Sequence, residues 1–187
     1  VADIGMAKKI ADVVVVSHHW GLHFIPRVIA DYQPIVAKAA FEAGADLILG
    51  HHAHAPKAIG VHGSKVCFYS LGNFILTSNL NSSARVTPAQ AATFAKRYGI
   101  TLDPDYHHRL IHGSDGKRSL IAKAVLTPKG VKKVSFLPVL IDTQLRPEVL
   151  FHEDPRFDEA VRFMEWVSED FNHRFLVDGN EVVITGA

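Results

Sequence analysis

The sequence predicts an α/β fold that contains a parallel βαβ unit, a β-hairpin and a helix near the C-terminus. Three patterns indicate this fold: a valine run without alternation, an apolar helical pattern followed by a second apolar strand, and a turn between two long strand patterns. The length of 187 residues is sufficient for one hydrophobic core without disulfide bonds. We therefore expect residues 1–187 to form a single domain.

The βαβ unit occupies the first third of the chain. Residues 11–17 (ADVVVVS) show no alternation, which is typical of a strand that is buried on both faces. Apolar residues at helical spacing across 29–43 predict a helix, and Gly44 follows as its C-cap. Residues 45–49 (ADLIL) predict a second short strand. We expect the two strands to be parallel and joined by a right-handed crossover.

The later elements follow from pattern and turn residues. Residues 77–117 are polar and irregular, and we expect an excursion or lid there. The turn Thr127-Pro-Lys-Gly130 joins the two strands of the hairpin. The expected elements are a strand over 65–70, a helix over 88–98, hairpin strands over 119–126 and 131–141, an amphipathic helix from Pro155 to about Arg174, and a strand over 181–185.

Composition excludes several classes of protein. The chain has 20 Lys and Arg against 19 Asp and Glu, a net charge of +1 without a basic stripe, so we do not expect a nucleic-acid partner. No apolar run approaches the roughly 20 residues that a membrane-spanning helix needs. The charged N-terminal residues are unlike a signal peptide. The chain as given is expected to be soluble, and its start at Val1 suggests a processing or cloning boundary.

Histidine is frequent, with 12 residues, and two groups of histidines follow the two predicted parallel strands. His19 comes after the first strand, and His52 and His54 come after the second. The carboxyl ends of neighbouring parallel strands share one edge of a sheet, where ligands usually bind. In extended backbone, His52 and His54 would point to the same side. We predict that the three imidazoles hold a divalent metal ion; the alternative is that they are polar loop residues.

Three segments carry a resemblance to a known family. Residues 12–21 (DVVVVSHHWG), 44–54 (GADLILGHHAH) and 68–74 (FYSLGNF) together resemble the CapA (PGA_cap) family of capsule synthesis proteins, which is associated with poly-γ-glutamate. The family belongs to the calcineurin-like metallophosphoesterase superfamily. The resemblance therefore implies an α/β sandwich around a two-metal site, and it covers nearly the whole chain.

The resemblance also implies roles for particular residues. His19 matches the isolated histidine ligand, and His52 and His54 match the pair in the Gly-His-x-His element. Asn73 is similar to a family residue near the substrate, either as a hydrogen-bond donor or as a turn former. His23 stands where many members have Glu, and His51 lies at a variable position. We expect His23 or His51 to act as the catalytic proton donor to a leaving group.

The chain departs from the family pattern at its beginning. The Asp-bearing strand end, the Gly-Asn-Leu-Glu element and the Asn-Asn-His element are missing from this sequence, so it resembles the C-terminal part of a CapA-like domain. A metal pair needs a bridging carboxylate, which histidines cannot supply. We therefore expect divalent ions (Mn, Zn or Fe), two in the intact domain and one or none in this chain.

Two functions remain open from the sequence. The first is a metal-dependent hydrolase that acts on a phosphoester or on the anionic polymer. The second is a non-catalytic component of capsule assembly that binds polymer or partner proteins. We expect a second copy of the chain or a complementing N-terminal segment as protein partner. The resemblance suggests the cell envelope or the extracellular space as location, with the cytoplasm as the alternative.

We do not expect a catalytic role for several other residues. Trp20 is expected to be a packing wedge that orients its loop. Ser17 and Ser70 lack the surroundings of a nucleophile elbow, and Cys67 has no neighbouring cation that would lower its pKa. A second polar cluster is expected to be a solvated loop: Asp103, Asp105, His107, His108 and His112.

Overall fold

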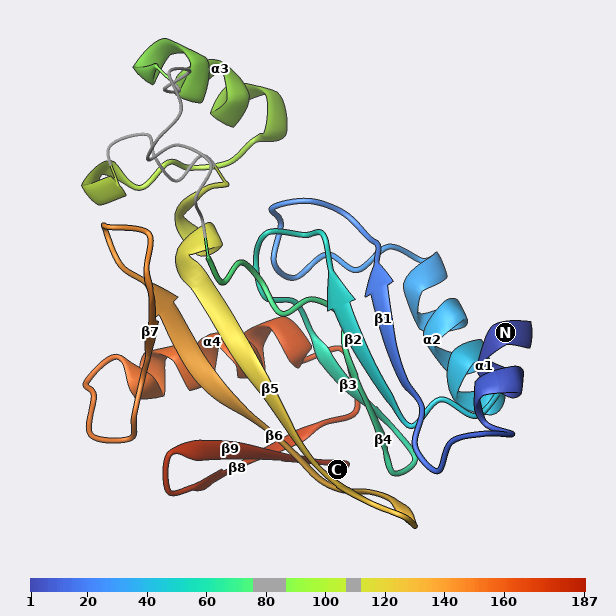
Figure 1. Ribbon diagram of the computed structural model, residues 1–187. Helices are drawn as coiled ribbons and strands as arrows, with labels where there is room; N and C mark the ends of the chain where they lie inside the picture. Colours follow the sequence, from blue (N-terminus) through green and yellow to red (C-terminus); the bar gives the residue numbers. More distant parts are fainter. Residues whose placement is uncertain (76–86, 107–111) are drawn as a thin grey trace.

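Two β-sheets with flanking helices form the protein, and the computed structural model describes residues 1–75, 87–106 and 112–187 (Figure 1). The first sheet has the order β1-β2-β4-β3, and the second has the order β5-β6-β9-β8 with β7 paired to β6. The α/β class predicted from the sequence is confirmed. The first sheet consists of β1 (Val15–His19), β2 (Leu47–His51), β3 (Ile59–His62) and β4 (Lys65–Phe68). The second consists of β5 (Arg118–Thr127), β6 (Gly130–Ile141), β7 (Pro147–Val149), β8 (Arg174–Asp178) and β9 (Glu181–Thr185).

The βαβ unit is confirmed. Strands β1 and β2 are parallel, and helix α2 (Tyr32–Glu42) connects them. The prediction that the first strand is buried on both faces is wrong. β1 is an edge strand in which Val15 is exposed while Val16 packs against the α2 side of the sheet. Within the described residues, none of β1 belongs to the hydrophobic cluster that includes the second sheet, and alternate residues of the valine run reach solvent.

The hydrophobic core has two main parts, one on each face of the first sheet. On one face, the strands pack against the second sheet and helix α4 (Phe157–Ser168), with Phe68, Phe136 and Met164 among the buried residues. On the other face, Phe41 of α2 packs with Tyr69 and other residues of the sheet. Burial on both faces makes β2 and β4 the rigid centre of the fold.

Short elements escaped the sequence analysis. Helix α1 (Ala2–Ala7), β3, β7 and β8 each have six residues or fewer, too few for periodicity to be clear. The predicted terminal helix is shorter than expected, because α4 ends at Ser168 and the chain turns into β8. Among the described residues, none of the helices is both long and apolar enough to cross a lipid bilayer.

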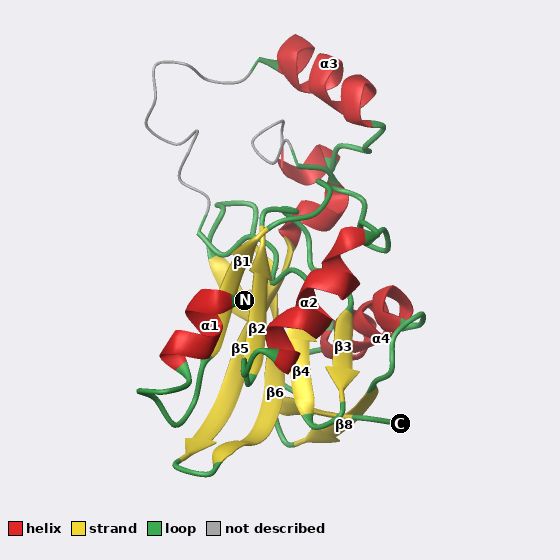
Figure 2. Ribbon diagram, turned by 90° about the vertical axis from the view of Figure 1, so that its right-hand side faces the viewer, coloured by secondary structure: helices red, strands yellow, loops and turns green. Residues whose placement is uncertain are grey.

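The excursion between the two sheets includes helix α3 (Pro88–Tyr98), which has the predicted bounds. Its N-terminus is a capping box in which Thr87 and Gln90 satisfy each other's backbone N–H groups. Figures 1 and 2 show α3 beyond the end of the sheet to which β1 and β2 point. The excursion is therefore on the same side of the fold as the histidine groups.

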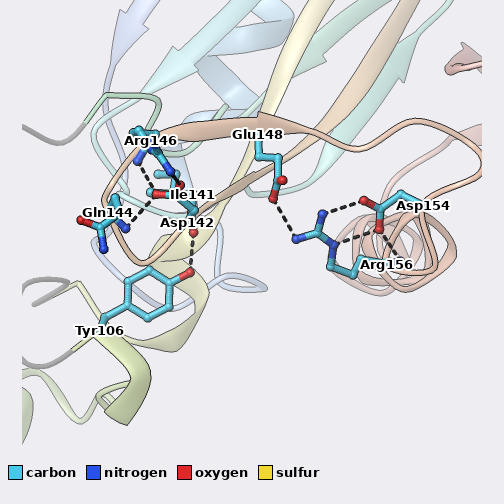
Figure 3. Close-up of polar contacts among 8 residues, drawn as sticks. All are labelled: Tyr106, Ile141, Asp142, Gln144, Arg146, Glu148, Asp154 and Arg156. Atoms are coloured by element: carbon cyan, nitrogen blue, oxygen red, sulfur yellow. Dashed lines mark hydrogen bonds and ion pairs between the residues drawn. The ribbon is translucent and has the colours of Figure 1, made fainter.

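The return of the excursion is fixed to the second sheet by Tyr106. Its hydroxyl donates a hydrogen bond to the carbonyl of Ile141 at the end of β6 (Figure 3). Nearby, Arg156 bridges Asp154 and Glu148 and so ties β7 to the start of α4. The Tyr106 contact thus anchors the excursion at the end of β6, and the Arg156 contacts fix the neighbouring β7.

Candidate metal centre

The histidines predicted to form a site lie where β1 and β2 end. His19 is the last residue of β1, His51 is the last residue of β2, and the two are register partners in the parallel pair. Trp20 confirms its predicted packing role: it is 6% exposed, and its Nε1 donates to the carbonyl of Tyr69 at 3.0 Å. This hydrogen bond fixes the turn after β1 against the centre of the sheet.

His19 and His52 form a close pair. The Nε2 of His19 and the Nδ1 of His52 are 2.8 Å apart, and the ring planes meet at 66°. Two imidazole nitrogens on one tetrahedral zinc ion would be about 3.3 Å apart, since each Zn–N bond is about 2.0–2.1 Å. A shift of about half an ångström would therefore let both lone pairs face one ion. The pair fits two positions of a mononuclear site.

His54 is oriented by a hydrogen bond to Asn73. The Nδ1 of His54 lies 2.7 Å from the Oδ1 of Asn73, and the Asn73 amide nitrogen donates to the carbonyls of His54 and Gly116, both at 2.9 Å. Since the oxygen can only accept, His54 carries its proton on Nδ1 and keeps a lone pair on Nε2. Metal-binding histidines commonly have this arrangement.

The turn after β2 is strained instead of extended. His52 and His54 have φ angles of 96° and 59°, and Phe24 in the facing loop has a φ of 65°. This corrects the expectation that extended backbone directs His52 and His54 to the same side. The bend instead directs His52 to His19 and His54 to Asn73. Such left-handed backbone at three neighbouring non-glycine residues is typical of functional sites.

His23 also reaches this cluster from the loop after β1. Its ring centroid is 3.9 Å from that of His52 and 6.0 Å from that of His54. Burial lowers the pKa of His23, and the neighbouring His54 and His19 add to this effect. Burial likewise lowers the pKa of His52, with His23 and His19 as further causes. The lowered pKa of both rings favours their neutral form, which binding of a metal ion requires.

The structure offers fewer contacts in support of the proton-donor roles and of a complete metal site. For His51, no ring contact with the cluster is found in the described ranges. Its predicted role and that of His23 as proton donors stay predictions. Across residues 1–75, 87–106 and 112–187, no three His, Cys, Asp or Glu side chains form a group that could hold a metal ion. Among these residues the His19–His52 pair brings two imidazole nitrogens together, without a third side chain of these types to complete a metal-binding group.

The predicted solvated loop is wrong for two of its residues. Asp103 is 9% exposed, and its carboxylate accepts a hydrogen bond from Lys117 at 2.6 Å, so its pKa is low. His112 stacks on His54, with ring centroids 4.1 Å apart and an interplanar angle of 1°. Burial lowers the pKa of His112 to about 4. His107 and His108 lie outside the described residues.

Lys57 is a residue that the sequence analysis missed. It is fully buried, and its Nζ donates to the carbonyls of Ile25 and Val28 at 2.6 and 2.5 Å. These bonds hold the loop that carries His23 and Phe24. The sequence signal was a single lysine within the apolar segment Ala53–Val61. Burial lowers the pKa of Lys57 to about 8.

Lys57 should make stability depend on pH in a predictable direction. Its pKa is about 8 in the folded protein, against an ordinary value of 10.5. Between these values the unfolded chain binds more protons, so this contribution to stability rises with pH. The difference in unfolding free energy between wild type and Lys57→Met should grow by about 2 kcal/mol from pH 7 to pH 10.

Urea unfolding at several pH values measures this difference. Burial also raises the pKa of Cys67 and Tyr69, so the stability of the folded protein falls at high pH for a reason unrelated to Lys57. Subtracting the value for the variant removes this shared effect. Lys129→Met, at an exposed lysine of the hairpin turn, is the matched control and should show a flat difference. A flat difference for Lys57→Met as well would contradict a lowered pKa.

Comparison with known proteins identifies relatives of the N-terminal part of the chain. Residues 1–78 match the family model of the bacterial capsule synthesis protein PGA_cap. A "PGA biosynthesis protein CapA" of Bacillus subtilis is 49% identical over 38% of the chain and 19% of that protein. A "Capsule biosynthesis protein CapA" of Bacillus anthracis is 45% identical over 36% of the chain and 16% of that protein. The chain thus spans less than a fifth of either relative's length. The family match at residues 1–78 contains His19, His23, His52 and His54 but not His112.

Proposed function

We propose that this chain supplies the histidine side of a divalent-metal site in a capsule-synthesis hydrolase, since residues 1–78 match the family model of the bacterial capsule synthesis protein PGA_cap. The observation that carries the proposal is the 2.8 Å separation between His19 Nε2 and His52 Nδ1 at the ends of adjacent parallel strands. His54, with its Nε2 lone pair free, is the third proposed ligand. To join the pair as a ligand, His54 would need the turn after β2 to change its conformation.

The proposed chemistry is hydrolysis of a phosphoester or of the anionic polymer. A divalent ion at this site would act as a Lewis acid and would acidify a bound water. The chain's own residues hold the neutral imidazoles in place and keep the loop with His23 next to them. His23, in its less populated protonated form, is the proposed proton donor, because its ring centroid is 3.9 Å from that of His52 and 6.0 Å from that of His54.

Metal binding and turnover test this proposal directly. The chain, purified without a His-tag or chelator, is dialysed against Mn²⁺, Zn²⁺ or Fe²⁺, and the bound metal is measured by mass spectrometry. We expect about one weakly bound ion per chain. Hydrolysis of p-nitrophenyl phosphate and of poly-γ-glutamate is then followed with each metal. Absence of bound metal at millimolar concentrations would contradict the proposal.

A second candidate function is binding of the anionic polymer or a protein partner without catalysis. It is favoured by the lack of a third ligand and of a carboxylate at the His19–His52 pair among the described residues. A metal-free chain that binds poly-γ-glutamate in a sedimentation assay would support this function and would count against the hydrolase.

Asn73 should control metal affinity through His54. Both of its amide hydrogens are used within the protein, so we propose that it orients His54. Asn73→Ala removes the acceptor for the Nδ1–H of His54 and should weaken Zn²⁺ binding about 10- to 100-fold. Asn73→Asp keeps an acceptor and should bind more tightly than Asn73→Ala. Isothermal titration with Zn²⁺ measures both, and equal affinities of the two variants would contradict this role.

A further inference from the structure

His112 packs face to face on His54, although it comes from a segment beyond the family match at residues 1–78. The ring centroids are 4.1 Å apart and the planes are parallel to within 1°. Phe24 adds a third ring, with centroids 5.8 Å from His54 and 5.7 Å from His112. The imidazole of His54 is thus contacted at its edge by the hydrogen bond to Asn73 and on its face by the ring of His112.

The stacked geometry excludes His112 as a ligand of the same ion. An ion bound to His54 lies in the plane of the His54 ring, because the nitrogen lone pair lies in that plane. Parallel rings in contact are separated by about 3.5 Å. The ion would therefore be displaced from the plane of His112 by a similar distance, and the lone pairs of His112 could not reach it.

The segment from His112 to Lys117 contacts His54 in a second way. The carbonyl of Gly116 accepts a hydrogen bond from the Asn73 amide, at 2.9 Å, and the oxygen of the same amide accepts the His54 proton. One short segment therefore acts on the face of the ring directly and on its edge through Asn73. The Nδ1 of His112 is buried and has no hydrogen-bond partner within the described part of the chain. The contact of this ring with its surroundings is therefore mainly the stacking on His54.

We propose that His112 is a positioning residue for His54, fixing the plane of its ring while Asn73 fixes its tautomer. Together the two contacts keep the Nε2 lone pair of His54 in one direction. The ring orientation is a property of the metal-free chain. Its consequence for metal affinity rests on the proposed function.

Nuclear magnetic resonance of the metal-free chain tests the orientation. The ¹⁵N shifts of the His54 ring report which nitrogen carries the proton. In wild type we expect the Nδ1–H form. In His112→Ala and His112→Leu, which lack a planar ring, the His54 ring should turn away from the Oδ1 of Asn73, so the shifts should move toward those of a freely exchanging imidazole. In His112→Phe, which keeps the ring, they should stay at the wild-type values.

Zinc titration of the same variants tests the consequence. We expect His112→Ala and His112→Leu to bind Zn²⁺ about tenfold more weakly and His112→Phe to bind within about twofold of wild type. His152→Ala is the matched control, since His152 is exposed and its ring also contacts an aromatic ring, that of Phe157. It should leave both readouts unchanged.

Several outcomes would overturn the positioning role. Wild-type ¹⁵N shifts in the alanine and leucine variants would show that the stacking does not orient His54. A phenylalanine variant as weak as alanine would show that the nitrogens of His112 matter and not its plane. If wild type binds no zinc, the proposed function fails, and the ¹⁵N shifts alone decide whether His112 positions His54.

Discussion

Replacing both His52 and His54 with alanine is expected to remove Zn²⁺ binding to below detection while the chain stays folded. His52 supplies the nitrogen that faces His19, and His54 supplies the free Nε2. Loss of two ligands should weaken affinity by more than about 100-fold, which is the upper range for losing one outer-shell partner. Both residues lie in a turn outside the hydrophobic clusters, so unfolding should change little. Isothermal titration and urea unfolding measure the two effects.

Single variants separate the two ligands. His52→Ala should have the larger effect, because it removes the partner of His19. His51→Ala, at the last residue of β2 next to this turn, is the matched control, since no contact of His51 with the other rings is found in the described ranges. Zinc affinity of the double variant equal to that of His51→Ala would refute the ligand assignment.

Gly50→Ala is expected to cause the largest loss of stability, about 3 kcal/mol or more. A Cβ atom at this position would lie 2.2 Å from the carbonyl oxygen of Tyr69 and 2.6 Å from that of Phe68. These are backbone atoms at the centre of the first sheet, and they cannot move without separating β2 from β4. The turn with His52 and His54 would shift as well. Urea unfolding measures the change.

Gly5→Ala is the matched control for this substitution. Gly5 lies in helix α1, and a Cβ atom there would meet nothing within 4 Å. Because alanine is a better helix former than glycine, the variant should be as stable as wild type or more stable by up to about 1 kcal/mol. Similar unfolding midpoints for Gly50→Ala and Gly5→Ala would contradict the close approach of β2 and β4.

The sequence predicted the elements whose patterns are long or have clear boundaries. The βαβ unit, α3 and the hairpin are found where expected, because their periodicity and their Gly and Pro residues are local signals. The face that β1 exposes could not be predicted, since it depends on how far the second sheet extends over the first. A valine run looks the same at the edge and in the centre of a sheet.

The candidate site likewise has features that local sequence patterns predict and features that depend on tertiary packing. Its position at the ends of β1 and β2 followed from strand order, and His19 and His52 do lie together. The contribution of His112 could not be predicted, because a histidine in a polar segment gives no sign of where that segment packs. Lys57 was missed for a related reason: its partners are backbone carbonyls, which leave no trace in the sequence.

Whether His19 and His52 bind one ion together can be measured by ¹⁵N nuclear magnetic resonance during a Zn²⁺ titration. We expect the Nε2 of His19 and the Nδ1 of His52, 2.8 Å apart in the metal-free chain, to shift together and to reach a plateau at one equivalent. Zinc that leaves both nitrogens unshifted, or that shifts the Nε2 of His52 instead, would show that the two histidines do not share an ion.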